Sequence, residues 1–281
     1  MALNTVKKGS LEYLTALDLK VPHAFTTRFG GVSEGVFASL NLAMHRGDAP
    51  ENVEKNYEIL ADALGFDLNN LVLTRQSHSD IVRVVTKSDA RGLDHHSYSE
   101  CDALITRDSG CALVVFTADC TPILLWDSIT GAVGAVHAGW RGTAADITGK
   151  TVRKMVSEFG CDPINIRAAI GPNIGACCFE TDSDVPEAII KTFGNDAAAF
   201  ITKTGEKYHI DLKSVNALAL RRVGVESIEI SDDCTMCDPQ RFWSHRIMGV
   251  NRGSQGAIII CRKRKNNGRV LRQKTDTLEE I

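Results

Sequence analysis

The amino-acid sequence predicts an α/β (α+β) fold in one domain. Short apolar runs that are typical of strands alternate with helix patterns along the chain. The 281 residues, 43% of them hydrophobic and 24% charged, are enough for one large core. The sequence has no linker, repeat or low-complexity boundary, so we assign residues 1–261 to a single domain.

The first third of the chain is expected to hold one helix between strands. This helix runs from about Pro50 to Leu64, with Asp48 as its cap and Gly65 just past its end. Strands are expected at residues 24–28, 71–75 and 81–85, with a turn-rich loop after the first and a bend at residues 76–78.

The centre of the chain is its most β-like part. Three apolar runs, at residues 112–116, 123–126 and 132–137, predict strands, and a five-residue turn suited to a hairpin joins the last two. Thr143 is expected to cap a helix that runs to about Phe159. Two more helices are expected after Asp184 and Asp211, and further strands at residues 164–170, 225–230 and 257–261.

Charge and cysteine content narrow the class of protein. A net charge of −3 gives no global basic field, so we expect neither nucleic-acid nor membrane binding. The first residues lack the apolar segment of a secretory signal, and nine cysteines without framework spacing indicate reduced thiols. We therefore expect a cytoplasmic protein, either a monomer or a homodimer. Residues 262–281 form a basic tail, for which a mobile terminus is favoured over a nucleic-acid arm.

Three segments present a His or Cys where an apolar strand gives way to a polar or glycine-rich loop. The residues are His78, Cys120 and His137. Imidazole nitrogen and thiolate sulfur are the ligands that Zn²⁺ favours, and a catalytic zinc site uses three protein ligands. Asp119, beside the cysteine, could orient a ligand as a neighbouring carboxylate. Each of the three residues alone would suit an ordinary core thiol or interior histidine, so spacing by itself makes only a weak case.

Other cysteines and histidines are weighed as further candidates. Cys234 and Cys237 have CxxC spacing, but no second such pair follows them, and structural thiols are favoured. Cys177 and Cys178 are adjacent, and we expect them to be too close to ligate one ion together. His245 follows an aromatic pair and could face the same pocket, whereas His95 and His96 are expected in an exposed loop.

Seven segments together resemble the YfiH/LACC1 family over residues 25–261. Its members have been called laccase-domain proteins or multicopper polyphenol oxidases, and more recently purine nucleoside phosphorylases. The matching stretches are TTRFGGVSEGVFASLNLAMHRGD (26–48), TRQSH (74–78), TADCTPILLWD (117–127), HAGWRGT (137–143), GPNIGACCFE (171–180), DDCTMC (232–237) and FWSHR (242–246). Ser77 and Ser79 depart from the family pattern, which usually has Val and Gly there, and Ile247 replaces a second arginine.

The resemblance implies a layered α/β sandwich around a mixed β-sheet, a metal site and an activity. The family's His, Cys and His ligands correspond to His78, Cys120 and His137, which makes these three the expected metal and catalytic residues. The implied metal is Zn²⁺, with Cu²⁺ as the alternative. The implied activities are phosphorolysis of adenosine, inosine and methylthioadenosine, and deamination of adenosine. Arg28, Arg46 and Arg141 lie in matching segments and are candidates for phosphate binding, while Asp119, Glu180 and His245 are candidate acids or bases.

Three other functions stay open. Cys120 could be the nucleophile of a Cys–His hydrolase or deamidase with His137 as its base, as in peptidoglycan-precursor editing. Copper-dependent oxidation of polyphenols, as in a laccase, is a weaker alternative because the eight histidines are scattered rather than paired. The third is a non-catalytic metal-binding module with a closed fourth coordination position.

Overall fold

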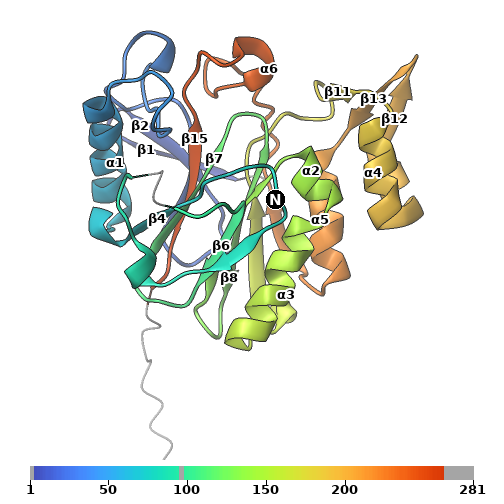
Figure 1. Ribbon diagram of the computed structural model, residues 1–281, viewed down its shortest axis with the longest axis horizontal. Helices are drawn as coiled ribbons and strands as arrows, with labels where there is room; N and C mark the ends of the chain where they lie inside the picture. The colour runs from blue at the N-terminus through green and yellow to red at the C-terminus, as the bar shows by residue number, and fades with distance from the viewer. Residues whose placement is uncertain (1–2, 95–97, 263–281) are drawn as a thin grey trace, which may run out of the picture.

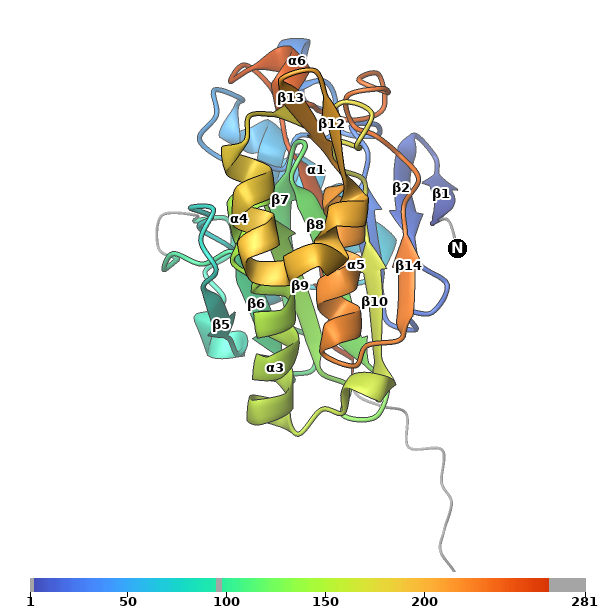
Figure 2. The same cartoon turned by 90° about the vertical axis from the view of Figure 1, so that its right-hand side faces the viewer.

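The computed structural model describes residues 3–94 and 98–262 and places their strands in two large sheets and one small sheet (Figures 1 and 2). The first sheet has the order β1-β2-β3-β15-β7-β4 and the second β14-β10-β8-β9-β6-β5. The strands of the first sheet are β1 (Asn4–Lys8), β2 (Leu11–Thr15), β3 (His23–Thr26), β15 (Gln255–Ile260), β7 (Ala112–Thr117) and β4 (Leu71–Leu73). Those of the second are β14 (Ser227–Ile230), β10 (Ile166–Ile170), β8 (Thr121–Asp127), β9 (Val133–Ala138), β6 (Ala103–Thr106) and β5 (Val82–Val84).

The two large sheets pack face to face, and helices cover their outer faces, which gives four layers (Figure 1). Helix α1 covers the first sheet, and α3 and α5 cover the second. The small sheet, β11-β13-β12, lies beside α4 at the edge of the molecule (Figure 1). The α-helices are α1 (Pro50–Leu64), α2 (Trp140–Ala144), α3 (Ile147–Phe159), α4 (Asp184–Phe193), α5 (Leu212–Arg222) and α6 (His245–Met248), and the strands of the small sheet are β11 (Glu180–Thr181), β12 (Ile201–Thr204) and β13 (Lys207–Ile210).

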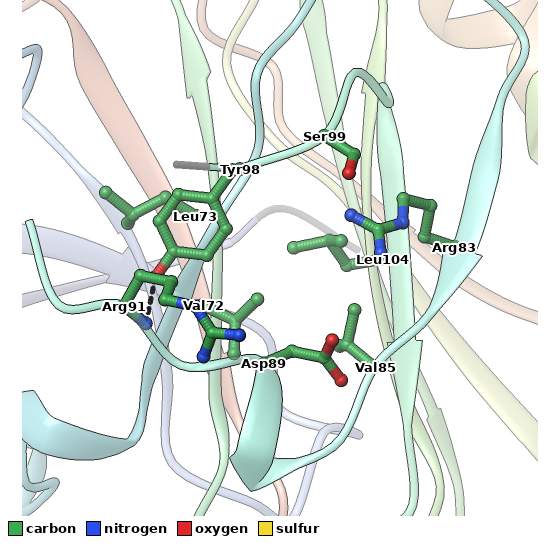
Figure 3. A pocket seen from close by; sticks show the side chains of 9 residues that line it. All are labelled: Val72, Leu73, Arg83, Val85, Asp89, Arg91, Tyr98, Ser99 and Leu104. Atoms are coloured by element: carbon green, nitrogen blue, oxygen red, sulfur yellow. Dashed lines mark hydrogen bonds between the residues drawn. The ribbon is translucent and has the colours of Figure 1, made fainter. Parts of the chain in front are cut away.

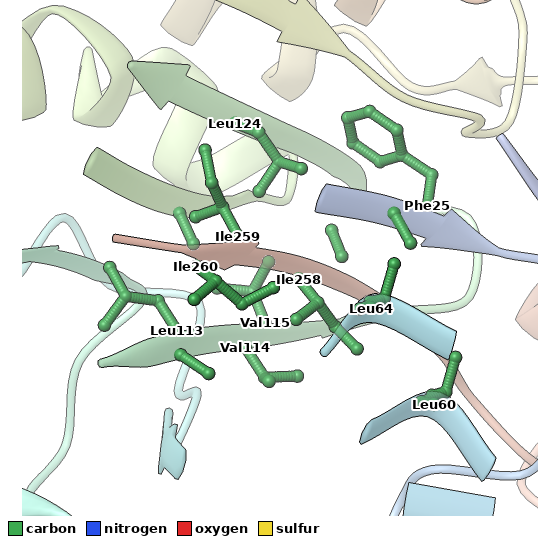
Figure 4. Close-up of a cluster of buried hydrophobic side chains, with 14 of the residues drawn as sticks. Phe25, Leu60, Leu64, Leu113, Val114, Val115, Leu124, Ile258, Ile259 and Ile260 are labelled. Carbon is green, nitrogen blue, oxygen red and sulfur yellow. The ribbon is translucent and has the colours of Figure 1, made fainter. Parts of the chain in front are cut away.

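The main core lies on both sides of the first sheet. Figure 4 shows side chains of β7 and β15, such as Val115 and Ile258, packed between Leu60 of α1 and Leu124 of the second sheet. Strands β7, β8, β9 and β15 are almost completely buried, which is why their sequences read as continuous apolar runs. This burial makes the ends of the central strands a rigid base for the loops that follow them.

The predicted fold class is confirmed, and both large sheets are mixed: β4 runs parallel to β7, and β10 parallel to β14, among antiparallel pairs. The helix expected from Thr143 to Phe159 is instead two helices, α2 and α3. The division falls at Asp146, which adopts a left-handed φ of 58° and caps α3 by accepting a hydrogen bond from Gly149 N. Helix α1 has the predicted bounds, but its cap is Ala49, and Ser183 is the cap of α4.

Asp48, the predicted cap of α1, instead uses its Oδ2 to accept hydrogen bonds from Ser33 and Asn41. The predictions for His95, His96 and most of the basic tail fall outside the described residues. Among the helices described in residues 3–94 and 98–262, none has the length and apolarity to cross a membrane.

Candidate functional site

Residues 118–120 carry the chain from the first large sheet to the second. This turn joins β7 to β8, and Asp119 within it has a positive φ of 85°. Strand β8 then pairs antiparallel with β9, with Thr121 opposite Ala138 and Pro122 opposite His137. The short turn and this register therefore place Cys120, at the start of β8, beside His137, at the end of β9.

His78 reaches the same point from the loop that follows β4. Its backbone has a left-handed φ of 60°. Its Nε2 lies 3.8 Å from Cys120 Sγ, and its ring stands edge-on to that of His137 with centroids 5.1 Å apart. One ligand atom from each of the three residues lies within 4.8 Å of the others. The structure thus brings together all three residues that the sequence and the resemblance predicted.

Asp102, which the sequence analysis did not identify, holds the ring of His137 and the backbone of the loop that carries His78. It is fully buried just before β6, and His137 Nδ1 lies 2.7 Å from its Oδ1. The same carboxylate accepts hydrogen bonds from the backbone N–H groups of Ser77, His78 and Ser79 and from Ser79 Oγ. Since Nδ1 of His137 donates to Asp102, Nε2 is the nitrogen left to bind a ligand once it gives up its proton. Ser79 thus supplies a hydroxyl donor in addition to its backbone N–H.

The charges of this cluster depend on one another. Burial alone would raise the pKa of the Cys120 thiol, but His137 and His78 outweigh it and lower that pKa to about 6. Burial alone would lower the pKa of His137, but Cys120 and Asp102 raise it to about 9. Burial also opposes ionisation of Asp102, yet the hydrogen bonds from His137 and Ser79 lower its pKa to about 2. The cluster therefore favours a thiolate, which is the form of cysteine that binds metals or attacks carbon.

Gly139 follows β9 directly against this cluster. A Cβ added there would lie 2.8 Å from His78 Cδ2 and 3.3 Å from Cys120 Sγ. A side chain at this position would push His78 out of place, so glycine is needed for close approach.

The cluster lies in a cavity of about 380 Å³, which is within the range of small-molecule sites. One side of its lining is aromatic and aliphatic, and the other is rich in arginine. The apolar lining includes Phe116, Trp140, Ile174 and Phe179, and the basic lining includes Arg46, Arg141, Arg246, Arg252 and His245.

Two of the three predicted phosphate-binding arginines, Arg46 and Arg141, line the cavity. Arg28, the third, does not line the cavity: its guanidinium donates to the carbonyl oxygens of Ala38 and Pro239 and lies 5.1 Å from the Trp243 ring. These contacts fix Arg28 as a brace between two loops.

Arg252 is a basic residue of the cavity that the sequence analysis missed. It is only 7% exposed, and its Nη1 donates to Gly253 O and Ser254 Oγ. Its Nε is buried without a hydrogen-bond partner among the described residues. Burial, with a smaller contribution from Arg46, lowers the pKa of Arg252 to about 10. Its position just before β15 carries no motif, so only the fold reveals it.

The candidate acids and bases are placed differently from one another. His245 lines the cavity, and its Nδ1 lies 3.0 Å from Gly249 O. Asp119 does not orient a histidine; its carboxylate accepts hydrogen bonds from Thr235, Ser244 and the backbone N–H of Arg246. The Glu180 carboxylate points instead to His209, with 3.8 Å between Oε2 and Nε2. Asp119 lines the cavity with its carboxylate engaged in these contacts, whereas Glu180 does not line the cavity.

A second, smaller cavity lies between β4 and the strand pair β5–β6 (Figure 3). Its volume is about 100 Å³, and Arg83, Asp89 and Arg91 contribute polar groups around Tyr98. The phenolic oxygen of Tyr98 is already hydrogen-bonded to Arg91 N and Leu71 O. This space would hold a few water molecules but not a nucleoside.

Comparison with known proteins identifies the family. Residues 22–262 match the family model described as multi-copper polyphenol oxidoreductase laccase. The chain belongs to this family. The purine nucleoside phosphorylase YlmD of Geobacillus stearothermophilus is 37% identical over 241 residues, 83% of this chain and 86% of that protein. Adenosine deaminase RL5, from an unknown prokaryotic organism, is 38% identical over 239 residues, 82% of this chain and 90% of that protein.

Solved structures of this family have the same fold. The crystal structure of YlmD from Geobacillus stearothermophilus superposes with a TM-score of 0.87 at 34% identity, covering 92% of this chain and 99% of that one. The Bacillus licheniformis hypothetical protein YfiH gives a TM-score of 0.86 at 33% identity, with the same coverage. The predicted membership of the YfiH family is confirmed, and with it the assignment to a family of enzymes.

Proposed function

We propose that this protein is a zinc-dependent purine nucleoside enzyme, which cleaves adenosine, inosine and methylthioadenosine with phosphate and deaminates adenosine. The observation that carries the proposal is the convergence of His78, Cys120 and His137 in a cavity lined by arginines. The names of two relatives, a purine nucleoside phosphorylase and an adenosine deaminase, support the substrate class.

The donor set fits a zinc ion. Two imidazoles and one thiolate are borderline and soft ligands, and their atoms are close enough to share one ion. Asp102 presents His137 Nε2 as the ligand atom, and the lowered pKa of Cys120 favours the thiolate. A zinc ion held by these residues would supply Lewis acidity, which makes water a stronger nucleophile at neutral pH.

The two sides of the cavity suit the two parts of a nucleoside reaction. The aromatic rings of Phe116, Trp140 and Phe179 offer faces on which a purine can stack. Arg46 and Arg252 supply positive charge for phosphate, and the Nε of Arg252 is a buried donor without a partner among the described residues. A phosphate held beside the ribose would stabilise the positive charge that develops at C1′ as the glycosidic bond breaks, because the phosphate is negatively charged.

His245 is the proposed proton carrier. Its Nδ1 donates to Gly249 O, so Nε2 is the nitrogen that accepts or returns a proton. In phosphorolysis this atom would protonate the departing purine, and in deamination it would protonate the departing amine.

The test is to measure bound metal and product formation from adenosine, with and without phosphate and with and without a chelator. Hypoxanthine or adenine should appear only with phosphate, inosine should appear without it, and all activity should require the metal. Cys120→Ala should abolish both reactions. Full activity in metal-free protein would refute the zinc mechanism.

A Cys–His hydrolase is the second candidate, and the Cys120–His137–Asp102 arrangement is the observation that favours it. It predicts metal-independent amide hydrolysis that is lost in Cys120→Ala. Activity on an amide in the presence of chelator would select this alternative.

A further inference from the structure

A second cluster of thiols lies outside the proposed active site. Cys177 and Cys178 follow β10, and Cys234 and Cys237 follow β14, its parallel neighbour in the second sheet. Their four sulfur atoms all lie within 4.8 Å of one another. The Sγ of Cys237 is 3.5 Å from that of Cys177 and 3.4 Å from that of Cys178. Both adjacent thiols turn toward Cys237, whereas the sequence analysis expected them to be too close to ligate one ion together.

These separations match one tetrahedral metal ion. Four sulfurs at about 2.3 Å from a central zinc lie about 3.8 Å apart, whereas a disulfide needs about 2.05 Å. The observed sulfur–sulfur distances of 3.4–3.5 Å and the 4.8 Å upper limit lie on either side of the separation of about 3.8 Å expected around zinc. A disulfide would bond two of the four sulfurs and leave the other two unbonded, whereas one metal ion would be bound by all four.

The backbone holds the two thiol-bearing loops together before any ion binds. Asn173 and Cys234 form a parallel β-bridge, in which Thr235 N donates to Asn173 O at 3.0 Å. Gly175 N donates to Cys234 Sγ at 3.1 Å, a contact that stabilises a thiolate. The Lys213 ammonium, bound to Ser231 O and Asp233 O, adds a positive charge nearby. The backbone therefore holds the four sulfurs close together, and the contact from Gly175 N favours the thiolate of Cys234.

We propose that Cys177, Cys178, Cys234 and Cys237 bind a second Zn²⁺ ion in a closed, structural Cys₄ site. All four coordination positions are taken by protein thiolates, so this ion has no position for substrate. Binding releases the thiol protons to solvent, and no oxidation or reduction occurs. Cys178 and Cys234 pack against the hydrophobic cluster under α4, while Cys177 and Cys237 are exposed, so an ion can enter from solvent.

This ion would fasten the loops that form one side of the cavity. Ile174 and Phe179, which flank the first cysteine pair, line the cavity. Thr235, within the second pair, donates to Asp119 Oδ1 at 2.6 Å, and Asp119 precedes Cys120. The Cys₄ site would therefore support the cavity wall without taking part in the reaction.

The test counts zinc in the full chain, purified under reducing conditions and supplied with Zn²⁺ alone. The wild-type protein should hold two zinc ions per chain by native mass spectrometry and elemental analysis. Cys120→Ala should hold one, and the Cys177→Ala/Cys237→Ala pair, chosen because both residues are exposed, should also hold one. Cys161→Ala, a cysteine in a different core cluster, is the control and should hold two.

Cobalt replaces zinc as a spectroscopic probe if the paired variant does not fold. Co²⁺ bound to the Cys120→Ala protein should give the thiolate charge-transfer bands of a tetrahedral four-sulfur site. One zinc in the wild type that disappears in Cys120→Ala would overturn the proposal. So would a different bound metal, absent cobalt bands, or alkylation-resistant disulfides among the four cysteines in freshly purified protein. Retention of this second zinc in Cys120→Ala is independent of whether the nucleoside reactions occur.

Discussion

Replacing Asp102 with asparagine tests whether one buried carboxylate organises the whole metal-binding cluster. Asparagine has the same shape, but its amide nitrogen donates and cannot accept. Oδ1 of Asp102 accepts from His78 N and His137 Nδ1, and Oδ2 accepts from the backbone of Ser77 and from both N and Oγ of Ser79. Whichever way the amide is turned, at least two of these five hydrogen bonds are lost.

The magnitude follows from the number and kind of these bonds. Each hydrogen bond to a charged group contributes about 1.5–3 kcal/mol, so losing two costs about 3–6 kcal/mol of stability. The pKa of Asp102, lowered from 3.8 to about 2, gives a second and smaller value for the same loss of stability, about 2.5 kcal/mol. His137 also loses the partner that fixes its tautomer, for which a 10–100-fold loss of metal affinity is typical.

The assay is urea unfolding of metal-free protein at several pH values, together with zinc affinity from chelator competition. Because the folded pKa of Asp102 is lowered, its contribution is complete above pH 3.8 and is lost as the pH falls through about 2. The difference in unfolding free energy between wild type and Asp102→Asn should therefore be full at pH 7 and shrink in acid.

Asp127→Asn is the matched control for this substitution. Asp127 is also fully buried, but only its Oδ1 accepts hydrogen bonds, from Ile129 and Thr130, while Oδ2 has no partner among the described residues. An amide nitrogen fits at Oδ2 without loss, so zinc affinity should be unchanged. If Asp102→Asn kept wild-type zinc affinity within about threefold, the organising role of Asp102 would be refuted.

Three further predictions follow from the same site. Gly139→Ala should lower zinc affinity at least about tenfold, because its Cβ would lie 2.8 Å from His78 Cδ2; unchanged chelator competition would show that the loop gives way. Arg252→Lys should raise the KM for phosphate about 10–100-fold while adenosine deamination, which uses no phosphate, stays unchanged; an equal fall in both reactions would contradict a phosphate-binding role. In metal-free protein, alkylation of Cys120 followed by peptide mass spectrometry should show a midpoint near pH 6, and a midpoint near 9 would contradict the effect of the histidines.

The fold was predictable where local signals decide it. Helix α1 has the predicted bounds because Pro50 and Gly65 mark its ends, and α5 begins after Asp211 as expected. The two-sheet arrangement was not predictable, since β7 and β8 are neighbours in sequence yet belong to different sheets. Which strands pair depends on contacts far apart along the chain, such as β15 inserted between β3 and β7. The weakly apolar β1 and the small third sheet gave no signal strong enough to identify them.

The site was predictable only in part, for a similar reason. Residue type singled out His78, Cys120 and His137, because histidine and cysteine are unusual at strand ends and match the family pattern. Asp102 and Arg252 have common residue types in ordinary sequence settings, and their importance lies in burial and partners. Arg28 shows the converse: it stands in a matching segment, yet the fold uses its guanidinium to hold carbonyl oxygens.

Asp119 links the His78–Cys120–His137 cluster to the four-cysteine cluster. It lies in the turn that crosses from the first large sheet to the second. Its left-handed backbone lets the chain turn sharply from β7 into β8, which places Cys120 beside His137. The same residue's carboxylate holds Thr235, between the cysteines of the second cluster, and the backbone of Arg246 at the start of α6. Movement of the Cys234–Cys237 loop would therefore displace Asp119, the residue that precedes Cys120. The two proposed zinc sites would then have different roles. The closed site on that loop would hold the cavity wall in place, and the open site at His78, Cys120 and His137 would act on the substrate.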